Sequence, residues 1–114
     1  MNQGAALPTE GTFVIRSGDW STGDRPGESV RMLVNDPAGY QTMVMKLAAG
    51  PLGVLHDHDM IEQIYVIDGD FFDDESRYQA GDLVVRMPGT MHRAGSDNGC
   101  TLLITYTPCV RASA

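Results

Sequence analysis

The segment GPLGVLHDHDMIEQIYVIDG, residues 50–69, decides how the rest of this chain is interpreted. It places His56 and His58 two residues apart, with Glu62 four residues further on. Side chains alternate between the two faces of a strand, so an extended chain points both imidazoles to one face, and Glu62 shares their parity. Residues 59–61 can turn the chain and bring the carboxylate back toward the imidazoles. Imidazole and carboxylate together suit a borderline divalent metal.

A second segment, GDLVVRMPGTMH at residues 81–92, ends on the third and last histidine of the chain, His92. We expect His92 to come from a neighbouring strand, so that all three histidine imidazoles belong to one group of metal ligands. An isolated histidine is more often a hydrogen-bonded polar residue, and Glu62 also reads as a solvated carboxylate or as a hydrogen-bond acceptor near a metal. The two segments together predict one divalent metal ion, Fe, Zn, Mn or Ni. Its ligands are His56, His58, Glu62 and His92.

Short segments that are typical of strands fill most of the remaining chain. Strands that recur about every 8–12 residues with turns between them indicate an all-β sandwich or barrel. We expect a flexible arm over residues 1–11, a single domain over 12–114, a tight turn at Gly69 and an exposed acidic hairpin at 68–75. The expected strands are 13–16, 30–35, 40–48, 62–68, 82–87 and 100–107.

Composition excludes several classes of partner. The 114 residues carry a formal net charge of −7 with only eight Lys and Arg, which argues against nucleic acid and anionic membranes. No apolar run approaches the roughly 20 residues of a membrane span. The start, MNQGAALPTEG, lacks a basic segment and an apolar signal core, so we expect a soluble, cytoplasmic protein. Cys100 and Cys109 are too few for a disulfide framework and are expected to be reduced, structural thiols.

The two histidine segments resemble the two motifs of the cupin superfamily. The first matches at every spacing, and the second departs from the family at the usual proline, where Met87 stands, and at the closing asparagine, where Ser96 stands. The resemblance implies a double-stranded β-helix, a jelly-roll-like barrel, that holds one metal through the four residues named above. The positions that carry the resemblance are Gly50, His56, His58, Glu62 and Gly69 in the first motif and Gly81, Gly89 and His92 in the second.

Residues 62–104 are similar to a narrower group, which includes the cupin domain of ChrR-type zinc anti-sigma factors and small acetylacetone-cleaving dioxygenases. The chain has no preceding helical sigma-binding domain, so a free-standing anti-sigma role is not expected. Resemblance to small cupins implies a homodimer, and a first strand at 12–16, TFVIR, is a candidate for pairing across a two-fold axis.

The chemistry at the metal stays open between two classes. Four protein ligands on an octahedral metal leave two open positions, so Fe(II) would support a dioxygenase that acts on a small carbonyl or dicarbonyl compound. The alternative is a non-catalytic metal- or ligand-binding sensor module with a structural zinc. A vestigial site kept only for stability is a third reading. No catalytic residue is assigned.

Strand parity predicts which side chains face inward. On the strand at 40–48 these are Met43, Met45 and Leu47, and on the strand at 100–107 they are either Leu102, Ile104 and Tyr106 or the alternate set. The predicted substrate pocket comprises Met45, Ile64, Val66, Tyr106 and Arg86, each of which also reads as core or rim.

Overall fold

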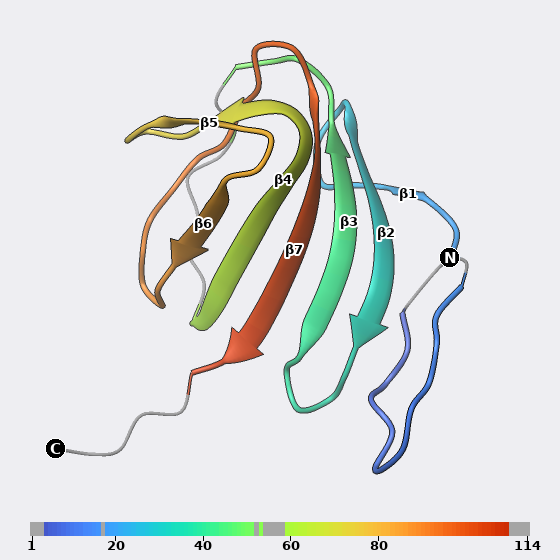
Figure 1. Cartoon of the computed structure of the whole chain (residues 1–114). Coiled ribbons are helices and arrows are strands. Elements are labelled where there is room, and N and C mark those ends of the chain that lie inside the picture. Colours follow the sequence, from blue (N-terminus) through green and yellow to red (C-terminus); the bar gives the residue numbers. More distant parts are fainter. Residues whose placement is uncertain (1–3, 17, 52, 54–58, 110–114) are drawn as a thin grey trace, which may run out of the picture.

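The structure is a computed structural model that describes residues 4–16, 18–51, 53 and 59–109. The described residues form strands and no helix, which confirms the predicted all-β class. No helix long and apolar enough to cross a membrane occurs among them. The strands are β1 (Ser21–Thr22), β2 (Glu28–Asn35), β3 (Gln41–Leu47), β4 (Met60–Phe72), β5 (Arg77–Gln79), β6 (Leu83–Arg86) and β7 (Cys100–Pro108), as Figure 1 shows.

All pairings between these strands are antiparallel, in the order β1-β2-β3-β7-β4-β5, and β6 also pairs with β4. The last strand, β7, lies between β3 and β4, so segments far apart in sequence are neighbours. The long β4 pairs with β6 over its first half and with β5 over its second half. Figure 1 shows β4 curling over at its end toward β5, which turns the sheet into a curved wall.

Strand alternation decides which side chains form the core. On β7, Leu102 and Ile104 are buried, and Tyr106 shares their face because it lies two residues further along the strand. This outcome settles the alternative that the sequence left open for β7. The core cluster comprises Met43, Leu47, Ile64, Val66, Phe71, Cys100, Leu102 and Ile104.

The sequence predicts a tight turn at Gly69, but the strand that carries Glu62 does not end there. The strand continues to Phe72, and Gly69 adopts a φ of 81° within it, next to a register shift between Val66 and Asp68. A Cβ at Gly69 would overlap the carbonyl oxygen of Gly99 and lie 2.8 Å from the Cα of Cys100. The residue therefore lets β4 bend while its backbone stays close to the start of β7.

The segment 13–16 is not a strand, which corrects the sequence prediction. A segment with alternating apolar residues forms a strand only where the edge strand of a sheet is free to pair with it. Here the free edge of β2 pairs with β1, and Ala5 forms a parallel bridge to Val34 on the same strand. Phe13 and Val14 are 42% and 62% exposed.

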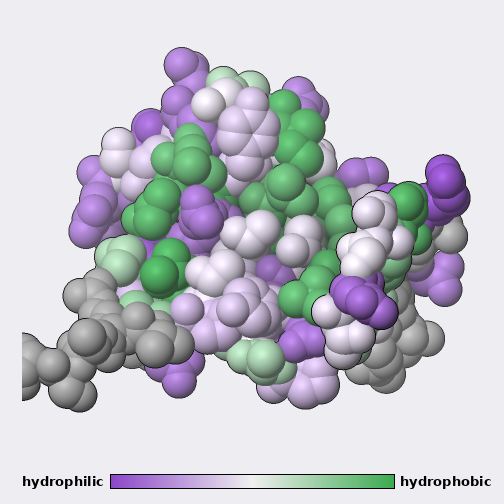
Figure 2. All heavy atoms as spheres, turned by 60° about the horizontal axis from the view of Figure 1, so that its bottom comes forward, coloured by the Kyte–Doolittle hydropathy of each residue, from purple (hydrophilic) through white to green (hydrophobic). Residues whose placement is uncertain are grey.

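Two further differences concern the acidic segment and the surface. Asp73, expected on an exposed hairpin, is buried, whereas Asp74 is exposed. Large apolar side chains also reach the surface, in patches broken by polar residues (Figure 2). Four of them alternate outward on two paired strands and are between 44% and 55% exposed. They are Tyr65 and Ile67 on β4 and Leu83 and Val85 on β6.

Candidate functional site

Glu62 lies at the centre of a buried polar cluster on the inner face of the sheet. Its register partner on β6 is Arg86 and its register partner on β7 is Tyr106, so three adjacent strands deliver three polar side chains at one level. The Tyr106 hydroxyl donates to Oε2 of Glu62 at 2.6 Å, and Nε of Arg86 lies 3.4 Å from Oε1. Glu62 is only 4% exposed, so its charge is balanced inside the protein.

Arg86 links this cluster to the turn that follows β4. Its Nη1 lies 2.8 Å from Oδ2 of Asp73, whose other carboxylate oxygen accepts from the backbone N–H groups of Glu75 and Ser76. The Tyr78 hydroxyl also donates to Asp73, at 2.8 Å. Burial alone would raise the pKa of Asp73, but these four hydrogen-bonding groups together hold it below its usual value. The guanidinium of Arg86 is thus held between the carboxylates of Glu62 and Asp73.

His92 faces the same carboxylate from the segment between β6 and β7. Its Nε2 lies 3.6 Å from Oε1 of Glu62, and its side chain is 6% exposed. Its Nδ1 lies 3.2 Å from the carbonyl oxygen of Thr90, which can only accept. This contact places the proton of a neutral imidazole on Nδ1 and turns the lone pair of Nε2 toward Glu62. Metal-ligating histidines are commonly oriented by such a backbone carbonyl.

Burial, the charge of Glu62 and the hydrogen bond to it all raise the pKa of Tyr106. Burial and the bond to Asp73 likewise raise the pKa of Tyr78 to about 12. Both phenols are therefore protonated donors at neutral pH. Burial also raises the pKa of the Cys100 thiol to about 11, in accord with a structural rather than a reactive thiol.

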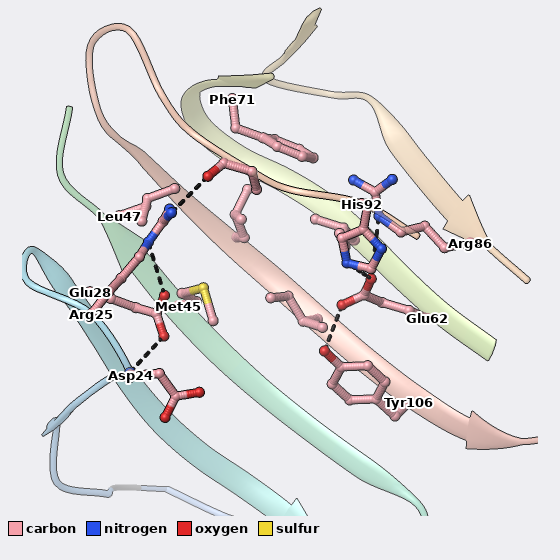
Figure 3. A pocket seen from close by; sticks show the side chains of 14 residues that line it. Asp24, Arg25, Glu28, Met45, Leu47, Glu62, Phe71, Arg86, His92 and Tyr106 are labelled. Carbon is pink, nitrogen blue, oxygen red and sulfur yellow. Dashed lines mark hydrogen bonds and ion pairs between the residues drawn. The ribbon is translucent and has the colours of Figure 1, made fainter. Parts of the chain in front are cut away.

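A cavity of about 510 Å³ opens onto this polar cluster (Figure 3). Of the predicted pocket residues, Met45, Ile64, Arg86 and Tyr106 line it. Val66 does not, because it is fully buried within the core. The remaining lining residues are Asp24, Arg25, Glu28, Leu47, Glu62, Phe71, His92, Ala94, Leu102 and Ile104.

Sequence patterns did not indicate the opposite end of the cavity, where Asp24, Arg25 and Glu28 lie (Figure 3). Asp24 and Arg25 belong to the turn-rich segment before β2, and Glu28 is the first residue of β2, so no periodicity connected them to the histidine motifs. Arg25 donates from Nη1 to the carbonyl oxygen of Ala94 at 2.7 Å, two residues after His92. That long-range bond brings the segment over the cavity.

The described residues supply part of the predicted ligand set. Glu62 and His92 are brought together, whereas His56 and His58 lie outside the described residues. Within the described ranges, no group of three or more His, Cys, Asp or Glu side chains is placed to hold a metal ion. The His92 imidazole and the buried Glu62 carboxylate, both at one end of the cavity, are chemically suited to a borderline divalent metal.

Several solved structures share this architecture. An RmlC-like cupin from Shewanella frigidimarina NCIMB 400 matches with a TM-score of 0.72 and 21% identity, over 89% of this chain and 93% of that chain. KdgF from a Halomonas species matches with a TM-score of 0.69 and 25% identity, over 89% and 96%. These likenesses confirm the cupin fold, a double-stranded β-helix.

A chain from the structure of Rhodobacter sphaeroides SigE in complex with the anti-sigma ChrR matches with a TM-score of 0.69 and 20% identity, over 82% of this chain. The present chain spans 52% of that chain, and 64% of an RmlC-like cupin from Ralstonia eutropha JMP134. No curated protein matches significantly in sequence. The family model of the ChrR cupin-like domain matches residues 9–110. The chain therefore belongs to the ChrR cupin-like domain family.

Proposed function

We propose that this protein binds one divalent metal through His56, His58, Glu62 and His92 and acts on a small carbonyl or dicarbonyl compound in the adjoining cavity. The observation that carries the proposal is the pairing of His92 Nε2 with Glu62 Oε1 at 3.6 Å, both buried at the end of a cavity of about 510 Å³. A cavity of this size lies within the usual range of small-molecule sites.

Two sets of side chains have different roles in this proposal. Polar side chains orient the Glu62 carboxylate, and apolar side chains line the cavity. Tyr106 and Arg86 hold the Glu62 carboxylate from two sides, so its position does not depend on the ligand. Side chains such as Met45, Ile64 and Ile104 give the cavity apolar walls that suit the body of a small dicarbonyl. When bound, Fe(II) would supply dioxygen chemistry at such a histidine-carboxylate site.

The metal proposal is tested first, by metal analysis of protein purified without chelators or nickel resin. We expect about one equivalent of metal in the wild type and its loss in His92→Ala, Glu62→Ala and His58→Ala. Asp74→Asn, which changes an exposed carboxylate, is the matched control and should retain the metal. Added metal should also raise the unfolding midpoint of the wild type but not of His92→Ala, because only a protein with the site gains binding energy. A full metal content in all three variants would rule the proposal out.

Catalysis is tested separately, by anaerobic reconstitution with Fe(II) followed by oxygen-uptake measurement across a panel of diketones. Oxygen consumption coupled to loss of the diketone is the expected result. Membership of the ChrR cupin-like family favours the alternative, a non-catalytic binding or sensor module with a structural zinc. Tight zinc binding without turnover or an exchangeable ligand would identify that module.

We also infer that the chain forms a homodimer. The four exposed apolar residues on the outer face of β4 and β6 support this inference, because contiguous exposed apolar surface commonly marks an interface. We expect sedimentation to give a dimer for the wild type and a monomer for Val85→Glu. Tyr40→Glu, at an exposed apolar residue outside these strands, should remain dimeric.

A further inference from the structure

The two ends of the cavity differ in chemistry. One end holds Glu62, His92, Arg86 and Tyr106, and the other holds Arg25, Glu28 and Asp24, with apolar side chains such as Met45 between them (Figure 3). A ligand that chelates a metal at the first end and extends along the cavity therefore meets a second polar surface.

Arg25 and Glu28 are held in place by contacts on several sides. Nε of Arg25 lies 3.5 Å from Oε2 of Glu28, and Nη1 of Arg25 donates to Ala94 O. Oε1 of Glu28 accepts from the backbone N–H of Asp24 at 3.2 Å. Their side chains are 28% and 13% exposed, so both lie largely inside the protein. Nη2 of Arg25 has no hydrogen-bond partner among the described residues, so a donor is available at this end.

Two glycines leave the space that this pair needs. A Cβ at Gly53 would overlap Nη1 of Arg25, and a Cβ at Gly23 would overlap the carboxylate of Glu28. Neither glycine has a positive φ, so backbone conformation does not require glycine at either position. Lack of a side chain is what these positions contribute, and it allows the arginine and the glutamate to occupy the cavity wall.

We propose that Arg25 and Glu28 form a second recognition point that selects ligands carrying a neutral hydroxyl or carboxamide at the end opposite the chelating group. The inference rests on the proposed metal site. Such a group accepts from the guanidinium and donates to the carboxylate at once. A carboxylate fits less well, because Glu28 and Asp24 together outweigh the single positive charge of Arg25.

The test uses the zinc-loaded protein, since zinc is redox-inert, and calorimetric titration with three homologous series of hydroxamic acids. The series end in a methyl group, a hydroxyl or a carboxylate, and each covers several chain lengths. At the best length we expect the hydroxyl series to bind at least about tenfold more tightly than the methyl series, because hydrogen bonds to charged partners are gained. The carboxylate series should bind more weakly than the hydroxyl series.

Arg25→Met, which keeps an apolar stem, should abolish the preference for the hydroxyl series over the methyl series. Gly53→Ala should weaken the same preference by displacing the guanidinium. Lys46→Met, which removes an exposed positive charge, is the control and should keep the preference. Equal binding of the hydroxyl and methyl series at every length would overturn the inference, as would a preference that survives Arg25→Met or a carboxylate series that binds tightest. Failure of all three series to bind zinc-loaded protein would instead show that the metal has no exchangeable position, which would sink the proposed binding of a carbonyl compound and this inference with it.

Discussion

Asp73 and Asp74 are neighbours in sequence with the same side chain, and the fold gives them opposite environments. Asp73 pairs with Arg86, and their side chains are 2% and 7% exposed. Asp74 pairs with Arg93 at 2.6 Å, and their side chains are 33% and 43% exposed. Both carboxylates have a lowered pKa, Asp74 through its hydrogen bond to Arg93 and Asp73 through several donors that outweigh burial.

The difference between the two pairs is what remains when one partner is lost. Water solvates Arg93 if Asp74 is removed, whereas Arg86 would keep a buried charge with Glu62 as its remaining acidic partner among the residues that the structure describes. Removal of one partner of a buried pair is costly, but exposed pairs contribute little. The contact distances are similar, so burial alone separates a structural ion pair from a surface contact.

The largest expected effect is that of Asp73→Ala. We expect it to lower the free energy of unfolding by about 3–5 kcal/mol, because it leaves Arg86 undercompensated in the interior. Urea denaturation monitored by fluorescence measures this change. A loss no greater than that of Asp74→Ala would mean that burial does not distinguish the two pairs.

The pH dependence of stability sharpens the comparison. The folded state lowers the pKa of Asp73 below its usual value of 3.8, so its ionised form contributes stability above that value. The contribution is lost as the pH falls through the folded pKa. Asp73→Asn should be less stable than the wild type by about 2 kcal/mol at neutral pH, and the two stability curves should converge in acid. Parallel curves in denaturant melts from neutral to acidic pH would contradict the assignment.

A smaller effect is expected from Tyr78→Phe. The change removes one donor to Asp73 but keeps the ring, whose centroid lies 4.8 Å from that of Phe71. We expect a loss of about 1 kcal/mol in the free energy of unfolding. With one hydrogen bond fewer, the pKa of Asp73 should also rise, so acid unfolding begins at a higher pH. Unchanged acid unfolding would show that Tyr78 does not hold the carboxylate.

The smallest effect is expected from Asp74→Asn. The carboxylate is exposed, and solvent screens its attraction to Arg93. Thermal unfolding should give the same midpoint as the wild type within experimental error, at both low and high salt. A clear destabilisation at low salt would mean that this surface pair contributes more than its exposure implies.

Recurring strand-like segments were sufficient to predict a β fold, and strand parity was sufficient to place Glu62 with the inward residues of its strand. Glu62, Ile64 and Val66 are all buried on β4, because alternation is a local property of an extended chain. The acidic segment shows where local patterns fail. Five carboxylates in eight residues read as solvated, but the turn after β4 directs Asp73 inward to meet Arg86.

Tertiary pairing also decided the ends of the cavity. Ser96 stands where the family usually has asparagine. Its hydroxyl donates to the Asp70 carbonyl at 2.6 Å and accepts from the backbone N–H of Gly99 at 2.8 Å, which closes the turn. Arg25 reaches Ala94 across 69 residues of sequence. Neither contact has a periodic signal, because each depends on which segments the sheet order brings side by side.

Periodicity was enough to derive the β class and the inward face of β4, since both follow from the covalent geometry of an extended chain. Donor type indicated which residues could bind a metal. The partners of each charge followed only from the folded chain. Burial and long-range contact set the free energy of a charged group, and both depend on the register of strands that are distant in sequence.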